Sequence, residues 1–307
     1  GIGPAYVDKV ARRGIRMVDL VETDTFRERL HVTLGRARRI VEGYFGAGGP
    51  EDEMRELITD ALDEAGVAER YLAAGERLGP HMVDGQAMVD AAMATGEHVL
   101  LEGQLGTMRD LDWGVYPYVT SSSPIPGGAS LGAGLPAVAI DRVLGVAKAY
   151  TTAVGAGPLP TELDDADGEL LRERGVEYGT STGRPRRCGW YDAVAVHYSV
   201  RLAGYQAIAL TKLDVLDGFA QIRIGTAYRD PADGREWTTV PASASAYARL
   251  EPVYEEVAGW QTDTTACRSW DDLPEAARGY VERLEALAGV PITHISVGPE
   301  RAQMIRR

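Results

Sequence analysis

Three arginines lie within four consecutive positions of one segment, directly after several hydroxyl-bearing residues and a glycine. They are Arg184, Arg186 and Arg187, in the run Thr-Ser-Thr-Gly-Arg-Pro-Arg-Arg at residues 180–187. Guanidinium groups bind carboxylates and phosphates through paired hydrogen bonds, and hydroxyl groups add further donors. The segment therefore predicts an anion-binding loop. The alternative is a solvated basic turn, paired with some of the chain's many acidic side chains.

A second motif, Lys212-Leu213-Asp214, follows the apolar run at residues 206–210. Guanine presents two adjacent hydrogen-bond donors, which one carboxylate can accept together, whereas adenine presents an acceptor at the same edge. The stem of a lysine can lie along a base. The motif therefore predicts a guanine-binding site at the end of a strand. An ordinary surface lysine and aspartate at a strand end is the alternative.

The composition limits the class of protein and its partners. The chain has 307 residues, of which 45% are hydrophobic, so it can bury one large core or two modest ones. Its net charge of −13 argues against nucleic acid or an anionic membrane as a general partner. No apolar stretch approaches the roughly 20 residues of a membrane helix. Cys188 and Cys267 are too few for a disulfide framework, and neither the cysteines nor the five histidines show metal-ligand spacing. We expect a cytoplasmic protein with no metal ligands in this chain.

The pattern of apolar residues changes along the chain. Residues 1–95 are expected to be mainly helical, with helices at residues 25–44, after a possible cap at Asp24, and at 51–65 and 84–94. In residues 96–307, short apolar runs alternate with helices. The predicted strands are residues 98–101, 147–154, 206–210 and 292–296, and the clearest helices are 193–202, capped by Asp192, and 273–287. This alternation predicts an α/β fold with a mostly parallel sheet and flanking helices.

Loops that could bind ligands follow the predicted strands. They are residues 102–107, 154–158, 212–214 and 296–299. In open parallel sheets, ligands bind where the strands end at their carboxyl edge. We therefore expect the functional groups to gather at that edge.

Taken in order, these motifs resemble the adenylosuccinate synthetase family from end to end. The matching runs are residues 1–6 (Gly-Ile-Gly-Pro-Ala-Tyr), 8–14, 116–122, 154–163, 182–184, 210–218, 289–292 and 296–301. The resemblance implies a ligase fold like that of the P-loop NTPases, lacking its N-terminal part. It also implies a reaction in which GTP phosphorylates the 6-oxygen of IMP and L-aspartate displaces the phosphate to give adenylosuccinate. Mg²⁺ and arginines would stabilise the charge that develops.

The resemblance also implies a role for individual residues. The GTP-binding residues would be Arg186, Lys212, Leu213, Asp214, Ser296, Val297 and Gly298. The aspartate-binding residues would be Thr180, Ser181, Thr182, Gly183, Arg184 and Arg186. The IMP-binding residues would be Arg12, Leu105, Thr120, Val154 and Arg184. Arg12 would reach into the partner's IMP site across a dimer interface, which implies a homodimer.

Several positions depart from the family pattern, mostly on the IMP side. The family sequence Glu-Gly-Ala-Gln-Gly is replaced by residues 102–106, so that Leu105 stands in place of a glutamine that contacts IMP. Gln104 could take its place if the loop shifts by one residue. The other departures are Trp113, Ser123, residues 124–126, Ala153 and Pro185. They raise the alternative of a divergent paralogue that joins aspartate, or an analogue, to a different purine-like acceptor.

The chain contains no Gly-x-x-x-x-Gly-Lys-Ser/Thr phosphate loop. In the family, this loop, the catalytic base, the catalytic histidine and most Mg²⁺ ligands would precede Gly1, so we assign no catalytic residue here. We expect the isolated chain to be inactive without that segment. The alternatives are a fragment of a full ligase, a non-catalytic nucleotide-binding or dimer-forming protein, and a half-enzyme completed by a separate chain.

Overall fold

The computed structural model describes residues 2–46, 51–179 and 183–307. The chain divides into two compact units, Gly1–Leu100 and Leu101–Arg307. The predicted boundary between residues 95 and 96 lies inside the first unit.

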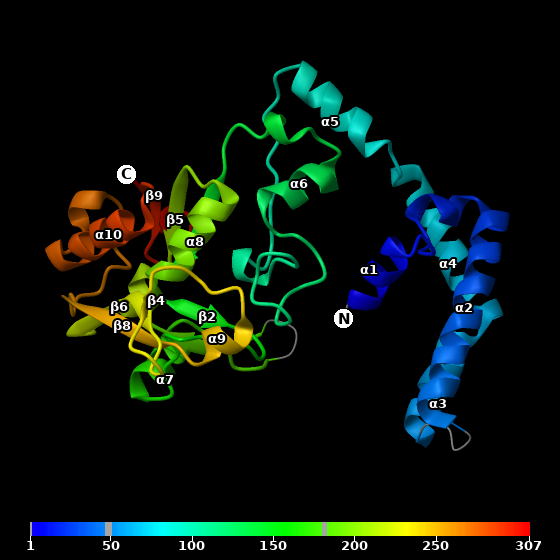
Figure 1. Ribbon diagram of the computed structural model, residues 1–307. Coiled ribbons are helices and arrows are strands. Elements are labelled where there is room, and N and C mark those ends of the chain that lie inside the picture. Colours follow the sequence, from blue (N-terminus) through cyan, green and yellow to red (C-terminus); the bar gives the residue numbers. More distant parts are fainter. Residues whose placement is uncertain (1, 47–50, 180–182) are drawn as a thin grey trace. The chain divides into compact units, whose positions relative to one another are not determined.

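The first unit is built from helices that share a small apolar core. Its elements are α1 (Gly3–Val10), η1 (Met17–Val21), α2 (Thr23–Phe45), α3 (Asp52–Leu62), α4 (Glu64–Leu78), η3 (Gly79–His81) and α5 (Gly85–Ala94) (Figure 1). Phe26, Leu30 and Leu34 recur every four residues on α2, which places them on one face of the helix. They are buried in a cluster with Leu20 and Ala68. The spacing of apolar residues along α2 thus accounts for the core of this unit.

Two of the three helices predicted in this unit are confirmed, and the third is wrong in its extent. α2 covers residues 25–44 but begins at Thr23, with Glu22 at the N-cap instead of Asp24. α5 follows Asp84, whose side chain accepts a hydrogen bond from the backbone of Ala87. The helix predicted at residues 51–65 is interrupted at Asp63. The carboxylate of Asp63 accepts a hydrogen bond from the backbone N–H of Gly66 at 3.0 Å, and so caps a new helix, α4.

The second unit contains the main sheet, in the strand order β1-β5-β9-β10. β1 (Leu144–Lys148), β5 (Ala207–Thr211) and β9 (Ile292–Ser296) are parallel, and β10 (Met304–Arg306) is antiparallel to β9. The helices α8 (Ala193–Ala203) and α10 (Glu275–Ala288) pack together beside β5 and β9 (Figure 1). The sheet is thus mostly parallel with flanking helices, as predicted.

Two smaller antiparallel assemblies complete the strands of this unit. β2 (Thr151–Ala153) pairs with β3 (Arg187–Gly189), and β6 (Gln221–Arg229) pairs with both β7 (Glu236–Trp237) and β8 (Glu251–Ala258). β4 (Tyr191–Asp192) runs parallel to β6. The remaining elements are η4 (Thr107–Arg109), α6 (Pro126–Ala133), η5 (Ala137–Ala139), α7 (Ala166–Arg174), η6 (Leu213–Leu216), α9 (Ala244–Ala248), η7 (Trp270–Asp272) and η8 (Arg301–Gln303).

The strand predictions in this unit are partly right. β5 and β9 confirm the strands predicted at residues 206–210 and 292–296, and α8 and α10 confirm both predicted helices. Residues 98–101 form no strand, and Leu100 is 91% exposed. The strand predicted at residues 147–154 is two strands, β1 and β2, which pair with different partners. The predicted strand thus contributes to two different sheets, because the chain bends at Ala149 and Tyr150.

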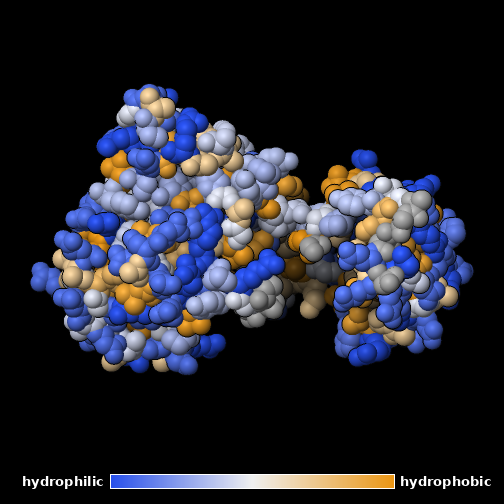
Figure 2. Space-filling model, turned by 90° about the horizontal axis from the view of Figure 1, so that it is seen from below, coloured by the Kyte–Doolittle hydropathy of each residue, from blue (hydrophilic) through white to orange (hydrophobic). Residues whose placement is uncertain are grey.

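On the face seen in Figure 2, hydrophilic residues cover most of the visible surface of both units, in keeping with the net charge of −13. Among the described residues, no helix has the length and apolar character needed to cross a membrane.

Candidate functional site

The predicted guanine-binding residues come together at one edge of the main sheet. Lys212 and Asp214 directly follow β5, and Ser296 ends β9, its parallel neighbour. Leu210 and Ile295 are paired across these two strands, and η6 contacts β9. Because parallel strands end at the same edge, the two segments meet where ligands bind in such sheets.

Asp214 has a carboxylate oxygen without a partner. Its neighbours Leu213, Val215 and Leu216 are buried, which anchors η6 and fixes the position of Asp214. The Oδ1 atom of Asp214 is buried and accepts no hydrogen bond from the part of the chain that the structure describes. Burial raises the pKa of Asp214. A buried oxygen left unpaired costs about 1–3 kcal/mol, so this atom favours a ligand that donates hydrogen bonds.

The turn after β9 is tightly closed. The Oγ atom of Ser296 donates to the carbonyl of Gly298 at 2.7 Å, and the backbone N–H of Val297 donates to the carbonyl of Gln303 at 3.0 Å. A Cβ atom at position 298 would lie 2.3 Å from the side-chain oxygen of Gln303, so any other residue there would displace that side chain. The turn thus presents a backbone of defined shape beside Asp214.

Lys212 points into the protein at a buried carboxylate, Glu177. Its Nζ atom lies 3.0 Å from Oε1 of Glu177 and also donates to the carbonyl of Gly175. Lys148 and Tyr150 contact the same Oε1 at 2.7 and 2.5 Å, and Arg186 donates to Oε2 at 2.7 Å. The side chain of Glu177 is fully buried.

Glu177 stays ionised because of these partners. Burial alone would raise its pKa, but hydrogen bonds from Lys148, Tyr150 and Lys212 and the charge of Lys148 outweigh burial and lower the pKa to about 2. The same carboxylate raises the pKa of Tyr150, together with burial, which is the larger cause. The cluster therefore combines one negative charge with the three positive charges of Lys148, Arg186 and Lys212.

The arginines of the predicted anion-binding loop have different surroundings. Gly183 and Arg184 are exposed, and Gly183 has a φ of 64°. Arg186 contacts Glu177, and its Nε atom is buried without a partner among the described residues. Thr180, Ser181 and Thr182 lie outside the described residues.

Arg187 does not belong to this group, contrary to the sequence pattern. Its guanidinium forms two hydrogen bonds with Glu162, through Nε at 2.6 Å and through Nη2. Nη1 donates to the carbonyl of Gly157 at 2.7 Å and to that of Gly155 at 3.3 Å. All three nitrogens are thus engaged in holding the loop after β2. Arg187 begins β3, whereas Arg186 precedes that strand, and the two side chains contact different carboxylates, Glu162 and Glu177.

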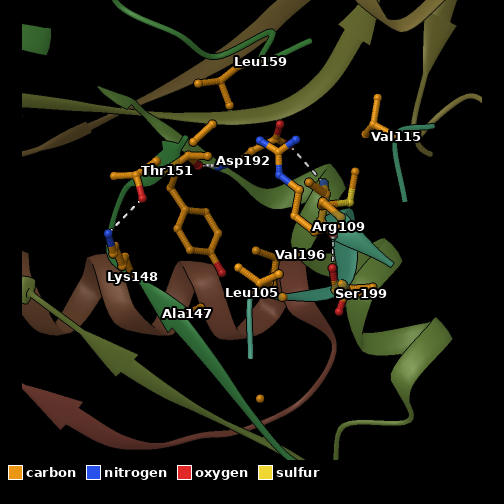
Figure 3. A pocket seen from close by; sticks show the side chains of 18 of the residues that line it. Leu105, Arg109, Val115, Ala147, Lys148, Thr151, Leu159, Asp192, Val196 and Ser199 are labelled. Carbon is orange, nitrogen blue, oxygen red and sulfur yellow. Dashed lines mark hydrogen bonds between the residues drawn. The ribbon is translucent and has the colours of Figure 1, made fainter. Parts of the chain in front are cut away.

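A cavity of about 290 Å³ lies between η4, β1, β2 and α8. Its walls combine apolar side chains, hydroxyl groups and two cations. They include Leu105, Thr107, Arg109, Val115, Lys148, Thr151, Thr152, Leu159, Asp192, Val196, Ser199 and Tyr205 (Figure 3). Leu105 lines this cavity, whereas Gln104 is not among its lining residues and donates to Oγ of Ser122 at 3.2 Å. Gln104 therefore does not take the place of the missing glutamine.

Arg109 is a cavity residue that the sequence analysis missed. Its guanidinium donates to the carbonyls of Tyr118 and Val154, and its own carbonyl accepts a hydrogen bond from the N–H of Thr120 at 2.9 Å. Burial, and then the charge of Arg187, lower its pKa. Arg109 thus joins the predicted IMP-binding positions Thr120 and Val154. Arg109 lies in none of the sequence runs that match the family, and no feature of its local sequence indicates a ligand contact.

Asp192 is the second buried carboxylate of the site. It begins α8, where it accepts a hydrogen bond from the N–H of Ala195 at 3.0 Å. The hydroxyl of Tyr228 lies 2.7 and 2.8 Å from its two oxygens. Burial raises the pKa of Asp192 to about 6 despite these donors, which are all neutral.

Three predicted ligand contacts have left-handed backbone conformations. Arg12, Leu105 and Lys212 have φ values of 57°, 61° and 61°. Such values are uncommon for residues other than glycine, and they cluster at functional sites. Arg12 lies in the first unit, after α1, and is exposed. Three residues that the sequence predicts as ligand contacts thus also have an unusual backbone conformation.

The described residues contain no group of three or more His, Cys, Asp or Glu side chains arranged to hold a metal ion.

Known proteins resemble this chain over its whole length. The adenylosuccinate synthetase family model matches residues 1–305. The adenylosuccinate synthetase of Heliobacterium modesticaldum is 48% identical over 305 residues, which cover 99% of this chain and 68% of that protein. The enzyme of Thermosynechococcus vestitus is also 48% identical, over 99% of this chain and 65% of that protein.

A solved structure has the same fold. The fully ligated adenylosuccinate synthetase from Plasmodium falciparum superposes with a TM-score of 0.87 at 33% identity, over 100% of this chain and 69% of that one. The chain thus spans about two thirds of the length of the proteins that it matches.

Proposed function

Because this chain belongs to the adenylosuccinate synthetase family, we propose that its sheet edge and cavity serve the GTP-dependent ligation of L-aspartate to IMP. The products are adenylosuccinate, GDP and phosphate. An oxo group on a purine is a poor leaving group. Phosphorylation converts it into phosphate, which the amino group of aspartate can displace.

The observation that carries this proposal is the unpartnered Oδ1 of Asp214 at the carboxyl edge of β5. The carboxylate would accept the two adjacent N–H groups of guanine, which adenine does not offer. The closed turn at residues 296–298 would cover the base beside it. These features support GTP, and not ATP, as the phosphoryl donor.

Aspartate would bind near Arg186. The Nε atom of Arg186 has no partner in the described part of the chain, while its Nη1 is held by Glu177. A guanidinium that is held by a carboxylate through Nη1 and has a buried, unpartnered Nε suits a carboxylate ligand. Arg184 and Gly183, and the loop residues at 180–182, would complete this site. The positive charge of the cluster would also stabilise charge that develops during phosphoryl transfer.

The acceptor would occupy the cavity lined by Leu105 and Arg109. Arg109 connects this cavity to the predicted IMP-binding positions, because it donates to the carbonyls of Tyr118 and Val154 and accepts a hydrogen bond from the N–H of Thr120. The apolar walls would contact the faces of a base, and the hydroxyl groups would bind its polar edges.

One observation favours a second candidate function. Leu105 lines the cavity where a glutamine would bind IMP, and Gln104 points at Ser122 instead. A leucine offers no hydrogen bond, so the cavity would also suit a purine-like acceptor without the group that the glutamine binds. The second candidate is the ligation of aspartate, or an analogue, to such an acceptor.

We further propose a homodimer in which Arg12 contributes to the partner's acceptor site. The helices of the first unit expose large apolar side chains, which mark surfaces that associate. They include Val7, Val10, Ile40, Tyr44 and Leu57. A ligase of purine nucleotide synthesis would act in the cytoplasm, where its substrates occur.

The test is a direct assay of the native protein with GTP, L-aspartate, Mg²⁺ and IMP. We expect adenylosuccinate and GDP to form in equal amounts, and ATP to replace GTP poorly. Formation of product with another purine nucleotide but not with IMP would favour the second candidate. If no purine gives a product that depends on both GTP and aspartate, the proposed function is wrong.

A further inference from the structure

One buried carboxylate contacts all three proposed substrate sites. Glu177 contacts Lys212 of the guanine site and Arg186 of the aspartate site. It also contacts Lys148 and Tyr150, which line the acceptor cavity. The four donors come from three separate parts of the chain, which meet at this side chain. No motif in the sequence pointed to Glu177.

The three cations share this one counter-charge. Lys148, Arg186 and Lys212 lie 2.7, 2.7 and 3.0 Å from the carboxylate of Glu177. Across the described residues, none of the three lies within ion-pair distance of another carboxylate. Any change in the position of one cation therefore changes the field that acts on the other two, since charges interact strongly where water is excluded.

The backbone around Glu177 is unusual in a way that fixes its side chain. Val176 has a φ of 49°, which is rare for a β-branched residue and unfavourable. A Cβ atom at the buried Gly175 would lie 2.1 Å from the hydroxyl of Tyr150, so only glycine allows this approach. The carbonyl of Gly175 also accepts a hydrogen bond from Lys212. The segment 175–177 thus holds the carboxylate against its donors at the expense of local strain.

We propose that Glu177 is a positioning residue that couples the binding of GTP to the binding of aspartate, through Lys212 and Arg186. This inference rests on the proposed function. Guanine bound at Asp214 would cover Lys212, whose side chain is 34% exposed, and would so keep it on Oε1 of Glu177. The carboxylate then holds Arg186 on Oε2 in the orientation that leaves its Nε free for aspartate. Each ligand thereby organises the site of the other without touching it.

The coupling can be measured in the native protein without turnover, by leaving out the acceptor. Titration calorimetry gives the affinity for L-aspartate with and without saturating GTP and Mg²⁺, and the affinity for GTP with and without aspartate. Coupling requires both ratios to be the same. We expect GTP to strengthen aspartate binding by roughly 10-fold, within the usual range for coupled sites.

Glu177→Gln removes the charge but keeps the shape of the side chain. In this variant we expect the ratio to fall close to one, while each ligand still binds alone with reduced affinity. Glu162→Gln is the matched control, since Glu162 holds the neighbouring Arg187 in a similar ion pair that faces the loop after β2. The control should keep the ratio of the native protein. A merely structural role for Glu177 would lower both affinities and leave their ratio unchanged.

A second variant covers the case in which Glu177→Gln does not fold. Tyr150→Phe removes one hydrogen bond to Oε1 and no charge, and we expect it to lower the ratio about 2- to 3-fold. An unchanged ratio in this variant, or in a folded Glu177→Gln, overturns the coupling and leaves the proposed function intact. Failure of the native protein to bind GTP or aspartate at all would instead overturn the proposed function, and the coupling with it.

Discussion

The guanine side and the acceptor cavity each contain a buried carboxylate, but the two are stabilised in opposite ways. On the guanine side, Glu177 lies among three cations, and its pKa falls to about 2. At the cavity, Asp192 receives only neutral donors, and burial raises its pKa to about 6. The surroundings of Glu177 are thus ionic, whereas the donors to Asp192 are polar and uncharged, although the same cavity is also lined by the cations Arg109 and Lys148.

This difference matches the ligands that we propose for each side. Aspartate and the phosphates of GTP carry negative charge, and the excess positive charge around Glu177 attracts them. A purine base is uncharged, and apolar walls with scattered hydroxyl groups suit it. Most departures from the family pattern, such as Leu105 and Ala153, lie on the cavity side, although Pro185 lies beside Arg186, while Lys212 and Asp214 are kept. In this proposal, the charged side binds the two ligands that the family shares, GTP and aspartate, and the acceptor can vary at the cavity.

The largest expected effect is on nucleotide choice. Asp214→Asn replaces one acceptor oxygen by a donor, which would face the donors of guanine. We expect GTP affinity to fall roughly 10³-fold, about 4 kcal/mol, and the preference over ATP to disappear. Competition binding with GTP and ATP measures the affinity for GTP and the preference for GTP over ATP. Asp233→Asn, on an exposed loop of the same unit, is the control and should change neither. A preference for GTP that survives in Asp214→Asn would place the guanine site elsewhere.

The next effect is the acid sensitivity of the ionic side. The folded-state pKa of Glu177, at about 2, lies below the ordinary glutamate pKa of 4.5. Its ionised form therefore adds stability that is complete above pH 4.5 and is lost as the pH falls towards 2. The shift corresponds to about 3 kcal/mol. Denaturant unfolding of the native protein between pH 2 and 6 should show this loss of stability. In Glu177→Gln, the free energy of unfolding should depend less steeply on pH over the same range. If the free energy of unfolding depends on pH equally in both proteins, the cations do not stabilise the ionised form of Glu177.

Asp192 should have the opposite sign and a slightly smaller effect. Its pKa rises from 3.8 to about 6 on folding, so it adds stability below pH 3.8 that is lost as the pH rises through 6. Asp192→Asn keeps the helix cap but cannot ionise. We expect this variant to be more stable than the native protein at pH 7, by up to about 3 kcal/mol, and to lose the advantage near pH 4. If the variant is less stable at pH 7, the donors around Asp192 favour its ionised form, and its surroundings do not behave as neutral.

The two sides also differ in how much the sequence predicts of them. Lys212 and Asp214 follow a short apolar run with clear turn residues, so the strand, its edge and the guanine motif could all be placed in advance. β9 and its turn at residues 296–298 could be placed for the same reason. Glu177 could not, because it is a single acidic residue in a chain with 45 of them, and its role depends on donors that are distant in sequence.

The cavity could not be predicted for a different reason. It forms where β1 and β2 separate, whereas the sequence predicts one continuous strand there, at residues 147–154. The long antiparallel pair β6 and β8 was missed as well, since charged residues such as Arg223 and Glu256 alternate with its buried ones and pair across the strands. Arg109 and Arg187 show that residue type alone did not separate a ligand site from a structural ion pair.

The smallest expected effect tests whether the acceptor varies. Leu105 lines the cavity in a left-handed conformation, and Leu105→Gln would restore a hydrogen-bonding side chain there. If IMP is the acceptor, we expect kcat/KM for IMP to rise up to 10-fold, about 1 kcal/mol, the usual value of one hydrogen bond. The affinities for GTP and aspartate should not change, since the substitution lies on the cavity side. Gln104→Leu is the matched control, because Gln104 faces Ser122 and should leave the kinetics with IMP as they are.

A fall in kcat/KM for IMP in Leu105→Gln would mean that the native leucine is itself adapted to IMP, and that the cavity has diverged without changing its acceptor. A rise for IMP together with a loss for another purine nucleotide would show that Leu105 selects that other acceptor. In that case the ionic side and the cavity have separated in function. The side that binds GTP and aspartate would be shared with the family, and one apolar side chain would decide what receives the aspartate.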